Sequence, residues 1–206
     1  MFVASRFLFV RRAAIGFRVH SGWAAMVAVS VEKGLPVVLA KRKLLLVKTF
    51  SYTFRQPYHT AEKMLLADAA EFVRAVESES RGLALAGIRA LQEELEKLDY
   101  KICGCSLLLA SGRALPEFER ILASHALIHT ADGELFRDSV RHSCAHSKLP
   151  LKAIKERDLL ATAASRLKKK PQFLNRYVAA LGKSLGPPWT ADEKMAALAA
   201  WLTLAN

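Results

Sequence analysis

Three groups of polar side chains in this sequence could carry chemistry. The first is Arg18, His20 and Ser21, within a segment, Gly16 to Ser30, that reads as two strands joined by a turn at Gly22. A guanidinium binds phosphate or carboxylate through two parallel hydrogen bonds, and an imidazole adds a third donor. Arg18 and His20 therefore predict an anion-binding site or, as the alternative, a salt bridge that ties this strand to another part of the chain.

The second group is a polar stretch between residues 124 and 137. We expect its first half to be a connector and a helix to follow from about 131 to 146. His129 or Glu134 could act as a general base if a pocket forms there, and Arg137 adds a second candidate for anion binding. These residues make the stretch a candidate catalytic site.

The third group is a set of histidines with four-residue spacing, His125 with His129 and His142 with His146. On a helix this spacing places two imidazoles on one face, where a Zn²⁺ ion could bridge them. No Cys-x-x-Cys accompanies them, and Cys144 would point away from the second pair. We therefore predict no metal site, and interpret the histidines as loop residues and exposed helical residues.

Basic residues dominate the charge of the chain. Its 206 residues include 31 Lys and Arg against 19 Asp and Glu, a net charge of +12 that attracts nucleic acid or another polyanion. Near the C-terminus, Phe173 and Tyr177 could stack on bases, although their spacing also suits packing into a core, which we favour. The basic residues beside them are candidates for nucleic-acid binding: Lys168, Lys169, Lys170 and Arg176.

Several classes of protein are disfavoured by what the sequence lacks. It has no Gly-x-Ser-x-Gly motif, no phosphate-binding loop and no dinucleotide fingerprint. No apolar run approaches the ~20 residues of a membrane span, so no membrane partner is expected. Three cysteines do not form a disulfide framework, which favours a reduced, cytoplasmic setting. The large apolar fraction leaves a homodimer interface as a further interpretation.

The order of elements predicts a single α/β domain covering residues 1–206. A strand meander over 14–50 precedes a helical region from Thr60 to Leu98, which Gly82 and Gly87 are expected to divide or bend. Thr60 is the expected cap of that region. The later elements are a buried strand at 102–110, a short helix at 116–122, a last strand at 151–154, a helix from Asp158 to Leu167 and a C-terminal helix within 186–206 that Thr190 caps; residues 1–13 read as an N-terminal extension.

This order resembles the ribonuclease H-like fold, with a mixed sheet that begins as an antiparallel meander. The segment Gly16–Trp23 resembles the first hairpin of bacterial Holliday-junction resolvases and similar uncharacterised proteins. The helix that leads into Leu149-Pro150 and the final helix, with its acidic start and Ala-rich face, are similar to theirs. The resemblance implies a nuclease-type fold over nearly the whole chain.

The same resemblance implies a mechanism that this sequence does not support. Enzymes of this fold bind two divalent cations, Mg²⁺ or Mn²⁺, through carboxylates of the first strand, the central strand and the last helix. Here Arg18 stands at the first-strand Asp position, and the central strand offers leucines (Leu107, Leu108 and Leu109). Only Asp192 and Glu193 match. Their place in the first turn of a helix also suits the helix dipole without any catalytic role.

Three functions follow from these observations. The favoured one is a non-catalytic or catalytically altered protein that binds nucleic acid or another polyanion through a basic surface. A metal-dependent nuclease with displaced ligands is the enzyme alternative, and its candidate ligands are Asp192, Glu193, Glu134 and Asp138. A structural homo-oligomer is the third. Whether Arg18 binds an anion or forms a salt bridge, it should lie close to Asp192.

Overall fold

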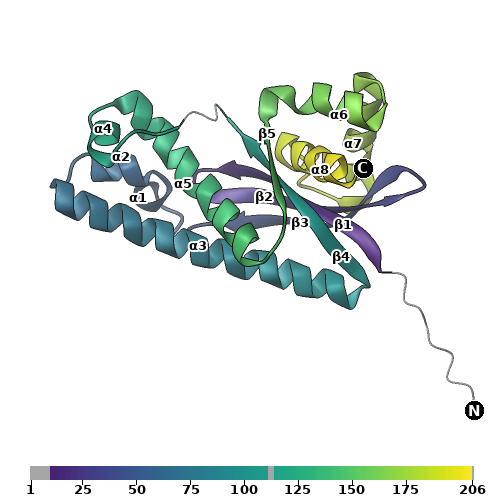
Figure 1. Ribbon diagram of the computed structural model, residues 1–206, viewed down its shortest axis with the longest axis horizontal. Helices are drawn as coiled ribbons and strands as arrows, with labels where there is room; N and C mark the ends of the chain where they lie inside the picture. Colours follow the sequence, from purple (N-terminus) through teal and green to yellow (C-terminus); the bar gives the residue numbers. More distant parts are fainter. Residues whose placement is uncertain (1–9, 111–113, 206) are drawn as a thin grey trace, which may run out of the picture.

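The computed structural model describes residues 10–110 and 114–205. Its centre is a mixed five-stranded sheet in the order β3-β2-β1-β4-β5 (Figure 1). The first three strands form an antiparallel meander, whereas β4 is parallel to β1 and β5 is parallel to β4. The strands are β1 (Arg11–His20), β2 (Trp23–Glu32), β3 (Leu35–Leu45), β4 (Tyr100–Leu109) and β5 (Leu151–Lys155). The prediction of a mixed sheet with an N-terminal meander is confirmed.

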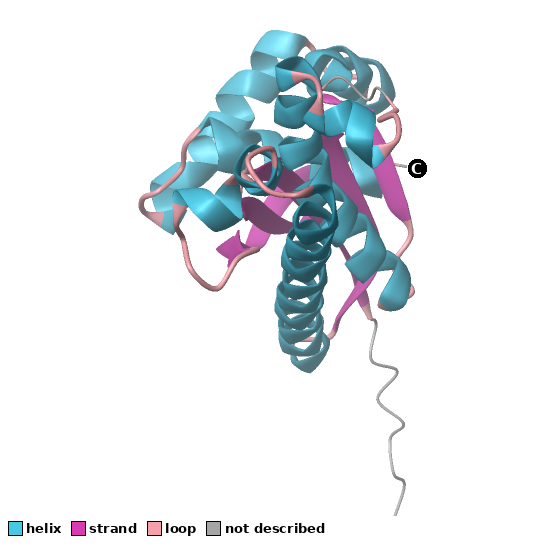
Figure 2. Cartoon of the chain, turned by 90° about the vertical axis from the view of Figure 1, so that its left-hand side faces the viewer, coloured by secondary structure: helices cyan, strands magenta, loops and turns pink. Residues whose placement is uncertain are grey.

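Helices cover both faces of this sheet (Figures 1 and 2). One face packs against the long helices α3 (Leu66–Lys97) and α5 (His125–His146), with the short helices α1 (Tyr52–Arg55), α2 (Pro57–Ala61) and α4 (Phe118–Leu122) beside them. The other face packs against α8 (Ala191–Leu204), which α6 (Leu159–Leu167) and α7 (Pro171–Leu185) flank. A single 3-10 turn, η1 (Glu156–Asp158), links β5 to α6. Among the described residues, no helix is both long and apolar enough to cross a membrane.

The alternation of side chains along β1 decides which residues meet α8. Ile15 and Phe17 lie in the apolar cluster under α3 and α5, so Gly16 and Arg18 project to the opposite face. Gly16 lets α8 approach closely, because a Cβ atom there would lie 1.9 Å from the carbonyl oxygen of Ala196. The strand therefore brings Arg18 beside the start of α8.

The expected division of the long helical region at Gly82 and Gly87 is wrong. Helix α3 is continuous through both glycines. Gly87 makes room for a methyl group of Leu44, from which a Cβ would be 2.3 Å away, so packing accounts for this glycine. Thr60 does not cap this region either, because it lies inside α2 and its hydroxyl donates to the carbonyl oxygen of Gln56 at 3.1 Å.

The predicted connector at 124–130 is also helical, because α5 begins at His125. Between its polar residues this segment carries an apolar helix face. On that face Ile128 and Ala131 pack with Ile121 in a small third core. The predicted N-terminal extension is wrong in part, since β1 begins at Arg11; residues 1–9 lie outside the described residues. Three later predictions are confirmed, namely the last strand, the helix that ends at Leu167 and the C-terminal helix with its cap.

Candidate functional site

Arg18 is held by two carboxylates that come from distant parts of the chain. Its Nε and Nη2 donate to the two carboxylate oxygens of Glu156, each at 3.0 Å, and its Nη1 donates to Asp192. The same oxygen of Asp192 lies 2.8 Å from Nε2 of His20. The expected proximity of Arg18 and Asp192 is confirmed, and the arrangement is a four-residue ion-pair network. All three nitrogen atoms of the guanidinium donate to carboxylate oxygens.

Strand direction and a helix cap place these groups. Because β1, β4 and β5 are parallel, their carboxyl ends lie at one edge of the sheet, and Glu156 follows the last residue of β5 directly. Asp192 lies in the first turn of α8. That turn is stabilised by a capping box, in which Thr190 accepts from the Asp192 amide at 3.2 Å and Glu193 accepts from the Thr190 amide at 2.7 Å. Glu193 therefore has a structural task at the helix start.

The network favours the charged forms of Arg18 and Asp192. The hydrogen bond to Glu156 raises the pKa of Arg18, against the opposing effect of partial burial. Partial burial acts to raise the pKa of Asp192, but the hydrogen bonds and charges of His20 and Arg18 outweigh it, so the pKa is lowered from its ordinary value of 3.8. The site therefore favours the ionised forms of Arg18 and Asp192.

This pKa shift predicts a pH dependence of stability. A carboxyl whose pKa is lower in the folded state stabilises the fold above its ordinary pKa, and this contribution is lost as the pH falls through the folded value. In Asp192→Asn we expect lower stability at pH 7 and a shallower loss of stability below about pH 4. Urea unfolding at a series of pH values measures both effects. Equal slopes in the two proteins would contradict the role given to Asp192.

The residues at this edge do not fit the two-cation centre that the fold implies. Arg18 neutralises both Glu156 and Asp192, so a divalent cation would have to displace a guanidinium from its partners. On the neighbouring strand, Phe17 pairs with Leu107, and the next residue, Leu108, is buried in the apolar cluster under α8. The central strand thus supplies an apolar side chain beside Arg18.

The other acidic candidates lie on the opposite face of the sheet. Glu134 and Asp138 belong to α5, whereas Asp192 and Glu193 belong to α8. Glu134 pairs with Arg137 at 2.8 Å, so the structure does not bring Arg137 to Arg18 as a shared anion site. The four carboxylates proposed as displaced nuclease ligands therefore do not form one group.

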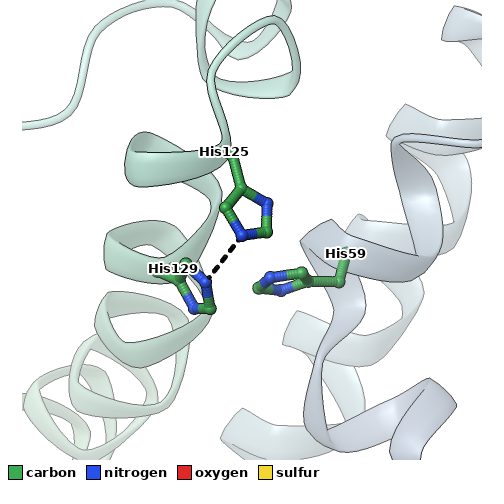
Figure 3. A group of neighbouring side chains, drawn as sticks. All are labelled: His59, His125 and His129. Atoms are coloured by element: carbon green, nitrogen blue, oxygen red, sulfur yellow. Dashed lines mark hydrogen bonds between the residues drawn. The ribbon is translucent and has the colours of Figure 1, made fainter.

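His129 lies in a cluster whose third member, His59, had not been predicted. It faces His125, one turn earlier in α5, and His59 of α2 (Figure 3). The cluster is next to Asp132, whose carboxylate binds His59. His142 and His146 are exposed near the end of the same helix and stack on each other.

The predicted basic residues belong to a series of cations along β5, α6 and α7. A pocket of about 540 Å³ lies between β5, α6 and the end of α8. Its lining includes three cations, Lys152, Lys155 and Arg166, and one acidic residue, Asp158. Lys168 follows the end of α6 directly, and a second hollow is lined by Lys169, Lys170, Phe173 and Arg176. We call this set the β5–α7 basic surface: Lys152, Lys155, Arg166, Lys168, Lys169, Lys170 and Arg176.

These cations are not matched by carboxylates. Within residues 10–110 and 114–205, none of them forms an ion pair, whereas arginines on α5 pair with acidic neighbours of their own helix. Phe173 and Tyr177 pack partly against the core under α8, and Tyr177 lies 6.0 Å from the ring of Trp201. The core interpretation of these aromatics is confirmed, with Phe173 still reaching the basic hollow.

Sequence reasoning missed two residues of these sites. Glu156 could have been found, because an acidic residue directly after a strand parallel to β1 must lie at the same edge of the sheet as Arg18. His59 had no local signal, since it is far from the other histidines along the chain and only the packing of α2 on α5 brings them together.

The fold has counterparts among solved structures. The structure of Thermus thermophilus RuvC has a TM-score of 0.52 with this chain at 11% identity, and the match covers 92% of each chain. T. thermophilus RuvC in complex with Holliday junction substrate has a TM-score of 0.54 at 10% identity, covering 94% of this chain and 93% of that one. No family model matches the chain, and no curated protein matches it in sequence. These likenesses confirm the ribonuclease H-like α/β fold.

Proposed function

We propose that this ribonuclease H-like protein binds the phosphate backbone of nucleic acid through the β5–α7 basic surface, without two-metal hydrolysis. The observation that carries the proposal is a run of cations on adjacent elements that lacks carboxylate partners among the described residues. The guanidinium of Arg18, by contrast, is paired with two carboxylates and offers no comparable site for an anion. Unpaired cations gathered in one place are the electrostatic feature that a polyanion requires.

The chemistry of the surface suits binding without sequence reading. Lysines contact phosphates as point charges, which positions a backbone but does not distinguish bases. Phe173 beside Lys169 and Arg176 offers an aromatic edge for a single-stranded segment. A similar fold, T. thermophilus RuvC, was solved with a Holliday junction, which makes branched DNA a reasonable probe beside duplex and single-stranded DNA.

The experiment is a salt titration of binding, measured by fluorescence anisotropy with labelled junction, duplex and single-stranded DNA. If about five phosphates are contacted on duplex DNA, the logarithm of the binding constant should fall with the logarithm of salt concentration with a slope of about −4.5. We expect the triple variant Lys168→Glu, Lys169→Glu and Lys170→Glu to weaken binding at least about tenfold and to reduce the slope.

A matched control separates a local surface from overall charge. Lys63→Glu, Arg89→Glu and Lys97→Glu change the net charge equally, at exposed positions in or just before α3. This control variant should retain most of the affinity. An equal loss in both variants, or no binding by the unaltered protein at low salt, would rule out the β5–α7 basic surface as the binding site.

The nuclease alternative is tested with the same DNA. Because Arg18 neutralises both nearby carboxylates, we expect no cleavage that depends on Mg²⁺ or Mn²⁺. Cleavage that is abolished by Asp192→Ala would favour the enzyme and overturn the non-catalytic part of the proposal.

A further inference from the structure

Three imidazoles converge where α2 packs against α5. His125 and His129 are one helical turn apart, and their Nε2 atoms are 3.0 Å from each other. His59 approaches from α2, and its ring centre is 4.4 Å from that of His129 and 5.3 Å from that of His125. One nitrogen from each ring lies within 4.8 Å of the other two (Figure 3).

A buried carboxylate orients the third imidazole. Nδ1 of His59 lies 2.5 Å from Oδ2 of Asp132, and the other oxygen of Asp132 accepts from the Tyr58 amide at 2.7 Å. Asp132 is only 1% exposed, so these bonds hold the histidine in place. Nδ1 faces the carboxylate, so the tautomer that donates from Nδ1 leaves Nε2 of His59 free, with its lone pair available to a metal. This is the arrangement that metal-bound histidines have with their supporting carboxylates.

The type and spacing of the ligands favour a transition metal such as Zn²⁺ over the alkaline-earth cations. Three neutral imidazoles suit Zn²⁺, whereas Mg²⁺ and Ca²⁺ prefer oxygen ligands. With Zn–N bonds of about 2.0–2.1 Å, tetrahedral geometry places ligand nitrogens about 3.3 Å apart, close to the separation already present in α5. His125 and His129 are exposed and can adjust by small side-chain rotations, while buried His59 stays fixed.

We propose that His59, His125 and His129 bind one Zn²⁺ ion, with a water molecule as the fourth ligand and Asp132 as the positioning residue for His59. The bound ion cross-links α2 to α5 and stabilises the packing of this end of the helical layer. The exposed side of the cluster leaves the fourth position open to solvent. The site lies on the sheet face opposite to α6, α7 and α8, so it stands independently of the proposed function.

The test uses the full-length protein without a histidine tag, stripped with chelator and then dialysed against Zn²⁺. We expect about one zinc per chain by elemental analysis, an increase in the melting temperature on adding Zn²⁺, and visible absorption typical of tetrahedral Co²⁺ when cobalt replaces zinc.

Two double variants in α5 make the test specific. His125→Ala with His129→Ala removes two ligands at exposed positions, so the fold should survive, and the affinity for Zn²⁺ should fall about 100-fold or more. His142→Ala with His146→Ala removes an exposed pair with the same spacing from the same helix and should leave affinity unchanged. Asp132→Asn should weaken binding by about 10–100-fold if it folds.

Two outcomes would overturn the proposed zinc site. Absence of stoichiometric zinc in the unaltered protein would overturn the proposal and leave the cluster as hydrogen-bonded histidines. An equal loss of affinity in the His142 and His146 variant would show that zinc binds surface histidines in general, and would overturn it as well.

Discussion

Replacing Gly16 with alanine is expected to lower the free energy of unfolding by about 3 kcal/mol, the upper end of the usual range for overpacked sites. The added Cβ would lie 1.9 Å from the carbonyl oxygen of Ala196, 2.7 Å from its carbonyl carbon and 3.0 Å from the amide nitrogen of Ala200. All three atoms are backbone of α8, so the clash cannot be relieved by turning a side chain. The helix must move away from β1, and Asp192 would move with it.

Gly82 provides a control with the same chemical change. It lies within α3 and is exposed, and a Cβ there meets nothing within 4 Å. Alanine favours a helix over glycine by about 0.5–1 kcal/mol, so Gly82→Ala should stabilise the protein. Urea unfolding followed by circular dichroism measures both variants. Similar effects of the two substitutions would contradict the close packing of α8 on β1.

The sequence predicts those parts of this fold that depend on local patterns. The hairpin, the buried central strand and the capped last helix are encoded by short-range patterns, and they were predicted correctly. The predicted break at Gly82 and Gly87 was wrong, because α3 is continuous and the missing Cβ of Gly87 makes room for Leu44. The contact between Gly87 and Leu44 joins residues that are far apart in the sequence, so no local pattern predicts it.

The candidate sites also divide into contacts that the sequence predicts and contacts that depend on tertiary packing. Arg18 and Asp192 could be placed together because the resemblance assigned both to one edge of a known fold, and the structure confirms their contact. The start of α5 was misassigned because Ser124 and the two histidines suggest a loop, whereas Ile128 beneath them is buried. The histidine cluster depends on contacts between helices that no local pattern encodes.

Replacing Arg18 with aspartate is expected to lower the free energy of unfolding by disrupting the ion-pair network. This variant removes the cation that Glu156 and Asp192 share and adds a third carboxylate beside them. Breaking a buried pair costs about 3–5 kcal/mol, and we expect about 2–3 kcal/mol here because Arg18 and its partners are partly exposed. The loss should appear in unfolding experiments with chelator present.

Divalent cations should reverse much of this loss. Three carboxylates at the edge shared by β1, β5 and α8 provide the oxygen ligands that Mn²⁺ and Mg²⁺ prefer. At a Mn²⁺ concentration of 100 times the dissociation constant, binding would restore about 2.7 kcal/mol. Arg18→Asn is the matched control, because it also removes the cation but adds no charge, and its stability should not respond to Mn²⁺. Equal responses of the two variants would show that the charge at position 18 does not decide whether this edge of the fold accepts a metal.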